Sequence, residues 1–367
     1  MTEAPNPAHM TQDPIAGLEG VVAATTSLSD VDGQNGILIL RGKKIEDLAG
    51  LVSFEEAVMH LWQDLDVAKV SSMVAAFGQA RLAAFEVVPL LEAAPPTLSV
   101  YERMQLGLAA LPLSEALPAP IAISGALPVF LAASHRIAHG KEPIAPDETL
   151  GCAKDLLRML TGEVPPKTHA DALNRYLVTI LDHGLNASTF TARVIGSTQA
   201  DMRQAILGAM GALSGPLHGG APGPVLDMID AIGAPENAED WITATLARKE
   251  RLMGFGHRIY RTRDPRADVL KSGLRQLGQE NPKVKLAEDI EREALAALKK
   301  AKPDRTLDTN VEFYTAVLLD AIGIDRSLFT PLFATGRTPG WCGHVLEQQQ
   351  NGKLIRPASQ YVGPMPE

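Results

Sequence analysis

From about Lys44 onward, apolar residues recur every three to four positions along most of the chain. This spacing places them on one face of an α-helix. The pattern predicts helices over Met73–Phe85, Ser99–Ala110, Ile121–His139, Asp147–Leu160, Ala170–Leu181, Ala200–Leu213 and Lys285–Lys300. A chain with so much helical periodicity is expected to adopt a mainly α fold.

Strand signals are confined to the N-terminal part of the chain. Val21–Thr26 and Ile37–Leu40 are short runs rich in β-branched and apolar residues. Between them lie Asp32-Gly33 and Asn35-Gly36, dipeptides that favour tight turns. The sequence therefore predicts one small β-hairpin before the helices begin.

Composition and charge limit the kind of partner. The 367 residues are 46% hydrophobic, which is enough for one large domain or two unequal ones. A net charge of −9 argues against nucleic acid or an anionic membrane as the main partner. No apolar run approaches the length expected of a membrane-spanning helix.

The two cysteines indicate a reducing compartment. Cys152 and Cys342 lie far apart and lack the spacing of metal ligands, so we expect free thiols in a reducing cytoplasm. Residues 1–16 lack a basic start and a continuous apolar stretch, so they do not resemble a signal peptide. They are expected to form a flexible N-terminal tail.

Four segments place polar groups in otherwise apolar surroundings, and each contains a candidate for acid–base chemistry. Histidine can donate or accept a proton near neutral pH, and arginine binds carboxylates with two parallel hydrogen bonds. The segments are Leu181–Arg193, Gly215–Ala221, Met253–Arg266 and Thr309–Thr315. Together they favour a site for a small anionic substrate.

Each candidate also has an ordinary structural interpretation. His183 could be a core or capping residue, and Glu312 could be a carboxylate that stabilises the first turn of a helix. Arg337 and Arg356 could form surface ion pairs of small energetic value. His135 and His139 share one helix face, but no third ligand accompanies them, so no metal site is expected.

Taken together, the segments resemble the citrate synthase family. Further similarity lies in Gly17–Ala23, Ser29–Gly33, Arg41-Gly42, Ile45–Leu48, Phe329–Ala334, Gly340-Trp341, His344–Gln348 and Leu354–Tyr361. The resemblance runs from about residue 17 to residue 364. It implies a two-domain helical fold, with a large domain (17–221 and 324–367) and a small domain (222–323) that closes over the substrates. Members of the family are normally homodimers.

The family's reaction joins the methyl carbon of acetyl-CoA to the ketone of oxaloacetate and then hydrolyses the thioester. The resemblance assigns Glu312 as the base, His218 as the donor to the enolate oxygen and His257 as the group acting on the ketone. Acetyl-CoA is a cosubstrate, and no permanently bound cofactor is implied.

The resemblance also implies the substrate contacts. Oxaloacetate would be bound by His183, Arg266, Arg337 and Arg356, with Arg356 contributed across the dimer interface. Coenzyme A would lie along the segment that contains Leu252, Gly254, Phe255 and Gly256, where glycines let a ligand approach the backbone closely.

The chain departs from the family pattern at four places. Glu312 and Thr309 replace the usual Asp and Pro, Pro222-Gly223 replaces Asn-Glu, and Gly184 replaces an acidic residue. The longer side chain of Glu312 shifts the carboxylate by about one methylene, and catalytic rates are sensitive to shifts near ~1 Å.

Three functions remain open at this point. The first is a citrate synthase of the tricarboxylic acid cycle. The second is a 2-methylcitrate synthase using propionyl-CoA, because one methylene is discriminated by only about 1–3 kcal/mol. The third is a catalytically silent CoA-binding relative, which only the Glu312 substitution supports. A metal hydrolase is disfavoured because the histidines lack clustered ligand spacing.

Overall fold

The computed structural model describes residues 16–18, 20–65, 67, 70–218, 222–256, 260, 262–278, 282–303 and 307–366. His257 and the Gly219–Ala221 stretch lie outside these residues, as does almost all of the expected N-terminal tail. The described part contains fifteen α-helices and a single three-stranded sheet, so the predicted mainly α class is confirmed.

The sheet is small and antiparallel. β1 (Ser29–Asp32) pairs with β2 (Ile37–Leu40), and β2 pairs with β3 (Lys43–Lys44). Gly36 in the connecting turn has φ +66°, and a Cβ there would lie 2.7 Å from a carbonyl oxygen of the helical body, which explains the glycine.

The hairpin forms, but its predicted first strand was wrong. Val21–Thr26 is not a strand, and Val22 is 86% exposed. The turn at residues 33–36 places Ser29–Asp32 opposite Ile37–Leu40, so the later segment becomes β1. Val21–Thr26 has no partner strand, and β-branched residues alone do not create one.

Most of the helices predicted by range, which correspond to α2, α4, α5, α6, α7, α9 and α13, occur within three residues of their expected bounds. All α-helices of the described part are α1 (Phe54–Leu61), α2 (Met73–Phe85), α3 (Val88–Ala93), α4 (Val100–Ala110), α5 (Ala119–Ala138), α6 (Cys152–Thr161), α7 (Lys167–Thr179), α8 (Ala187–Gly196), α9 (Met202–Leu213), α10 (Pro222–Ile232), α11 (Ala238–Ala247), α12 (Pro265–Gln276), α13 (Pro282–Ala301), α14 (Val311–Ala321) and α15 (Phe329–Asn351).

Helix α6 starts later than predicted. Residues 147–151 form a turn, and the Nη2 atom of Arg81 donates hydrogen bonds to the carbonyl oxygens of Asp147 (3.1 Å) and Leu150 (2.6 Å). Arg81 is fully buried and also pairs with Asp155 at 2.9 Å. Arg81, which is distant in sequence, thus binds carbonyl oxygens that would accept backbone hydrogen bonds in a regular helix.

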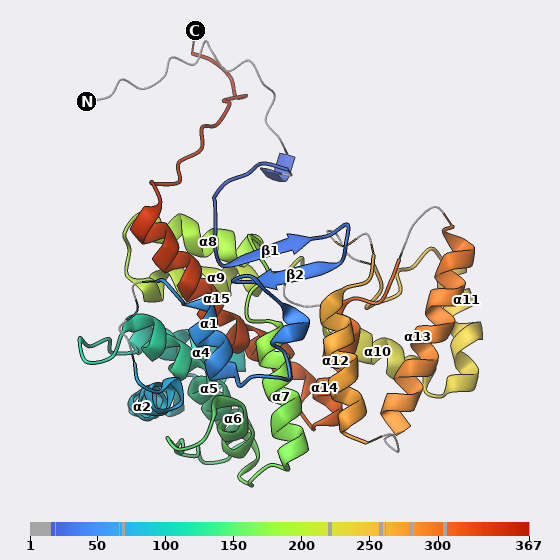
Figure 1. The fold of residues 1–367 in the computed structure, drawn as a ribbon, viewed down its shortest axis with the longest axis horizontal. Helices are drawn as coiled ribbons and strands as arrows, with labels where there is room; N and C mark the ends of the chain where they lie inside the picture. Colours follow the sequence, from blue (N-terminus) through green and yellow to red (C-terminus); the bar gives the residue numbers. More distant parts are fainter. Residues whose placement is uncertain are drawn as a thin grey trace.

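The core of the larger part is built around α5. Helices α2, α4, α6 and α15 pack against it (Figure 1), and its residues from Pro120 to Ser134 are all buried. By length and composition α5 could cross a membrane, contrary to the expectation from the sequence. However, 78% of its apolar stretch is buried inside the protein, as expected of a core helix.

Helices α10 to α14 lie together at one side of the molecule (Figure 1). α12 packs against α14, and α13 packs against both α11 and α14. The contact between α7 and α12 joins this group to the larger part. The group covers the range predicted for the small domain, whose boundaries and closure stay a prediction.

Candidate active site

His218 lies after α9 and is held by the first turn of α8. The backbone N–H of Ser188 donates to His218 Nε2 at 3.3 Å, and Ser188 Oγ lies 2.8 Å from the same nitrogen. Because a backbone N–H can only donate, this contact favours the tautomer with its proton on Nδ1. Burial, with a smaller effect of the charge of Arg337, lowers the pKa of His218 below 6.5. The imidazole is therefore a neutral hydrogen-bond donor at pH 7.

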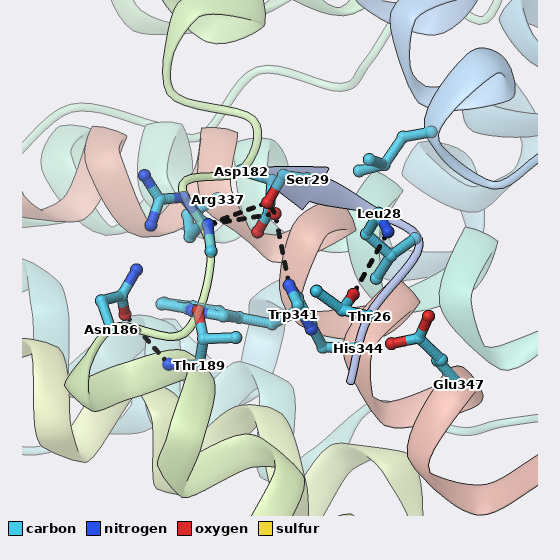
Figure 2. Close-up of polar contacts among 12 residues, drawn as sticks. Thr26, Leu28, Ser29, Asp182, Asn186, Thr189, Arg337, Trp341, His344 and Glu347 are labelled. Atoms are coloured by element: carbon cyan, nitrogen blue, oxygen red, sulfur yellow. Dashed lines mark hydrogen bonds and ion pairs between the residues drawn. The ribbon is translucent and has the colours of Figure 1, made fainter. Parts of the chain in front are cut away.

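The first turn of α8 is itself fixed by polar contacts. Asn186 is the N-cap, and its side chain accepts from the backbone N–H of Thr189 at 3.1 Å (Figure 2). Ser188 Oγ accepts from Trp341 Nε1 at 3.2 Å and lies 2.8 Å from Asn186 Oδ1. The position of His218 thus depends on α8 and α15 together.

His183 is buried in the loop between α7 and α8. Its Nε2 lies 3.1 Å from the hydroxyl of Tyr260, and the two rings meet edge to face. The guanidinium of Arg266 lies 5.7 Å from the centre of the Tyr260 ring. Two predicted oxaloacetate ligands, His183 and Arg266, therefore both contact one tyrosine, Tyr260.

Arg337 extends from α15 and is 1% exposed. Its Nε donates to the carbonyl oxygen of Ile180 at 2.6 Å, and its guanidinium lies 4.8 Å from the centre of the Phe333 ring. Burial lowers the pKa of Arg337 to about 10, although the Asp182 carboxylate counteracts this shift. The side chain remains a cation at neutral pH.

A buried polar network beneath His183 escaped the sequence analysis, which gave His344 no role. The Asp182 carboxylate accepts from Ser29 Oγ and from His344 Nε2, the latter at 3.2 Å (Figure 2). His344 Nδ1 accepts from Arg193 at 2.9 Å, which leaves the ring proton on Nε2. Burial would raise the pKa of Asp182, but His344 and Arg337 hold it below 3.8.

The network continues to the N-terminal segment. Arg193 pairs with Glu347 at 2.7 Å, and Glu347 accepts from the backbone N–H of Ser27 at 2.7 Å. The sequence signals were the Asp182-His183 dipeptide in an apolar run and the His344–Gln348 stretch that resembles the family. The partners are 150 or more residues away, so the sequence could not reveal them.

Arg266 stands in the first turn of α12. The carboxylate of Asp264, the N-cap of α12, accepts from Arg266 Nε at 3.0 Å and Nη2 at 2.8 Å. Burial alone would lower the pKa of Arg266, but Asp264 outweighs it and raises the pKa. The same carboxylate accepts from the backbone N–H of Val311 at 3.0 Å.

Glu312 is the second residue of α14. Asn310 is the N-cap of this helix and accepts from the backbone N–H of Glu312 at 3.0 Å. Burial raises the pKa of Glu312 above 4.5, while the nearby charge of Arg266 opposes the shift and that of Asp264 adds to it. A carboxylate in such a setting is a stronger base than one in water.

Electrostatic coupling indicates that these groups share one region. The pKa of His218 responds to Arg337, that of Arg337 to Arg266, and that of Glu312 to Arg266. Side chains from four distant segments therefore lie within range of one another's charge. The region combines two cations, a neutral imidazole and a basic carboxylate, as proton abstraction beside a bound dianion requires.

The segment Leu252–Gly256 runs beside the start of α14. Phe255 forms an isolated antiparallel bridge with Thr309, and Gly256 N–H donates to the Asp308 carbonyl oxygen at 2.7 Å. Gly254 has φ +81°, and a Cβ there would lie 2.8 Å from Phe313. Gly254 is therefore needed for internal packing, in addition to any close approach by a ligand. Leu252 is buried.

Arg356 does not lie with the other candidates. It is exposed on the extended segment that follows α15, and this segment leaves the body of the molecule (Figure 1). Ile355, its neighbour, donates its backbone N–H to Ser197 Oγ at 3.0 Å. The position of Arg356 suits a contact outside its own chain.

Among the described residues, metal-binding groups and thiols form no second centre. In the part of the chain that the structure describes, no three His, Cys, Asp or Glu side chains cluster closely enough to hold a metal ion. Cys152 and Cys342 are both free and buried, and burial raises the pKa of Cys342 to about 12. Neither thiol is a reactive nucleophile.

Comparisons with known proteins identify the family of the chain. Residues 17–358 match the family model described as citrate synthase, C-terminal domain. The chain is 40% identical over 365 residues to citrate synthase 2 of Bacillus subtilis, covering 95% of each chain. It is 37% identical over 360 residues to 2-methylcitrate synthase of Mycobacterium tuberculosis, covering 95% of this chain and 90% of that protein.

Solved structures show the same fold. Citrate synthase from Thermotoga maritima superimposes with a TM-score of 0.84 at 34% identity, covering 96% of each chain. Citrate synthase from Thermoplasma acidophilum, solved with carboxymethyl coenzyme A and oxaloacetate, gives 0.83 at 27% identity, covering 97% of this chain and 98% of that one. By its sequence and its fold, the chain belongs to the citrate synthase family.

Proposed function

We propose that the protein is a citrate synthase that condenses acetyl-CoA with oxaloacetate and water to give citrate and CoA. This places it in the tricarboxylic acid cycle, in the cytoplasm, as an acyltransferase without a permanently bound cofactor. One observation carries the proposal: His218 is neutral and accepts the Ser188 N–H at Nε2, which leaves Nδ1–H free to donate. An enolate oxygen is stabilised by such a donor.

Glu312 is the base. It removes a proton from the methyl carbon of acetyl-CoA, and its raised pKa makes it better suited to this weak acid. His218 donates to the developing enolate oxygen. His257, which lies outside the described residues, polarises the ketone of oxaloacetate. The new carbon–carbon bond gives a thioester, and water then hydrolyses it to citrate and CoA.

Oxaloacetate is held by its two carboxylates. Arg266 and Arg337 supply buried cations, and His183 supplies a further hydrogen bond. Arg356 completes the site from a second subunit, so the active form is a homodimer. The exposed position of Arg356 on an extended segment supports this assignment.

Coenzyme A lies along Leu252–Gly256, next to the helix that carries Glu312. The pairing of this segment with residues 308–310 brings a bound thioester close to the base. The small domain, residues 222–323, closes over both substrates and excludes water, while residues 17–221 and 324–367 form the large domain.

A 2-methylcitrate synthase is the alternative, and the 37% identity to the Mycobacterium tuberculosis enzyme of that name favours considering it. The two reactions use the same groups and differ by one methyl in the acyl pocket. Specificity constants for acetyl-CoA and propionyl-CoA decide between them, measured by oxaloacetate-dependent release of the CoA thiol. A preference for propionyl-CoA would replace the proposal by the alternative, and no release with either would indicate a silent relative.

A further inference from the structure

The buried carboxylate of Glu291 accepts hydrogen bonds from three donors near the segment that carries Glu312. Glu291 in α13 is 7% exposed. Its Oε1 accepts from Thr309 Oγ1 at 2.8 Å, and its Oε2 accepts from the Tyr314 hydroxyl at 2.6 Å and from Lys271 Nζ. The donors come from α12, from the loop before α14 and from α14 itself.

The three donors keep Glu291 ionised despite its burial. Desolvation would raise the pKa of Glu291, but Lys271, Tyr314 and Thr309 together lower it below 4.5. Charge-assisted hydrogen bonds of this kind are about twice as strong as neutral ones. The carboxylate is therefore a firm anchor at neutral pH.

The anchored residues flank Glu312 on both sides. Thr309 directly precedes Asn310, the N-cap of α14, and Tyr314 lies two residues beyond Glu312. In the described part of the chain no hydrogen bond joins Glu312 to Glu291, and the backbone N–H of Glu312 donates to Asn310. Glu291 can thus fix the backbone of residues 309–314 without occupying the site.

We infer that Glu291 is a positioning residue for Glu312, acting through Thr309 and Tyr314. This inference rests on the proposed function, in which Glu312 is the base. The carboxylate of Glu312 must reach the methyl group of the acyl-CoA to within a fraction of an ångström, and a misplacement of about 1 Å costs roughly 10²-fold in rate. Loosening the anchor at Thr309 moves the base, while the Lys271–Glu291 pair still holds α12, the helix that carries Arg266.

The test compares two variants that weaken the anchor with one that does not. Glu291→Gln removes the charge, and Thr309→Val removes one donor with little change of shape. The matched control is Glu288→Gln, one turn earlier on α13, where Glu288 pairs with Arg275 of α12 at the surface. Thr309→Ser should rescue the loss, because it restores the hydroxyl.

We expect kcat to fall about 10- to 100-fold in Glu291→Gln and Thr309→Val, with KM for oxaloacetate in Thr309→Val within about twofold of the wild type. The isotope effect on kcat with methyl-deuterated acetyl-CoA should rise, because proton abstraction becomes slower than later steps. A purely structural role would lower the amount of folded enzyme and leave the isotope effect unchanged.

The inference would be overturned if kcat and the isotope effect of Glu291→Gln and Thr309→Val equalled those of the wild type. A loss of kcat no greater than that of Glu288→Gln would overturn it as well. If Glu291→Gln does not fold, as judged by circular dichroism, Thr309→Val and Tyr314→Phe decide the matter, since each removes a single hydrogen bond. Absence of thiol release by the wild type would instead overturn the proposed function, so the two failures are distinct.

Discussion

The carboxylate of Asp264 accepts a hydrogen bond from the backbone N–H of Val311 at 3.0 Å. Asp264 caps α12 and pairs with Arg266, whereas Val311 is the first residue of α14 and precedes Glu312. One side chain therefore links the start of the helix with a candidate substrate arginine to the start of the helix with the candidate base. Residues far apart in sequence acquire a fixed relative position through this bond.

Glu312→Gln should lower kcat by about 10²–10⁴-fold, because the amide cannot accept the methyl proton. Oxaloacetate binding, measured by titration calorimetry, should stay close to that of the wild type. Glu312→Asp serves as the control, since it keeps the carboxylate and should retain part of the activity. Full activity of Glu312→Gln would remove Glu312 from the mechanism.

The same substitution should increase stability at neutral pH. Burial raises the folded-state pKa of Glu312 above 4.5. As the pH rises from 4.5 through this raised pKa, ionisation of the buried carboxyl lowers the stability of the folded protein. Glu312→Gln avoids this cost. Its melting temperature should exceed that of the wild type at pH 7, and the difference should shrink below pH 4.5, where both states carry a protonated carboxyl. An equal difference in melting temperature at pH 7 and below pH 4.5 would contradict the raised pKa of Glu312.

The pH profile of kcat/KM should have an acid limb. The mechanism needs Glu312 ionised and His218 neutral, and the pKa of Glu312 is raised above 4.5 while that of His218 is lowered below 6.5. Activity should therefore begin to fall while the pH is still above 4.5. In Glu312→Asp, kcat/KM should still fall toward acid pH. A profile that is flat down to pH 4 would argue against the roles assigned to Glu312 and His218.

Mixing two inactive variants tests the role of Arg356 across subunits. Arg356→Ala and Glu312→Gln homodimers should each be inactive. A heterodimer has one complete site, in which the Glu312→Gln subunit supplies its Arg356 to the other subunit. Unfolding and refolding an equal mixture should restore about a quarter of the wild-type activity. No recovery in a mixture shown by mass spectrometry to contain heterodimers would mean that Arg356 serves its own chain.

His344→Leu should destabilise the protein strongly, because it leaves Asp182 buried without one of its donors. Removing one partner of a buried ionic group costs about 3–5 kcal/mol, which urea unfolding can measure. The control is Lys167→Gln, which breaks the exposed Lys167–Asp171 pair and should cost at most about 1 kcal/mol. Similar losses in both variants would show that the network is of little energetic value.

Local periodicity was a good guide to the helices and a poor guide to strands and boundaries. α2 has the predicted bounds because its signals, an alanine-rich apolar run and Ser72 at the N-cap, lie within the helix and its cap. β1 was misplaced because its position depends on the turn that pairs it with Ile37–Leu40. The start of α6 was misplaced because it depends on Arg81, which is distant in sequence.

The candidate site divides in the same way. The sequence by itself determined the residue types: the histidines, the arginines and Glu312 stand in motifs that can be recognised along the chain. Only the tertiary structure decided which groups position them. Asp182 with His344 and Glu291 with Thr309 each join a loop to a helix through a single buried hydrogen bond, and such bonds leave no periodic trace in the sequence. Burial, which raises the pKa of Glu312 and lowers that of His218, likewise exists only once the chain is folded.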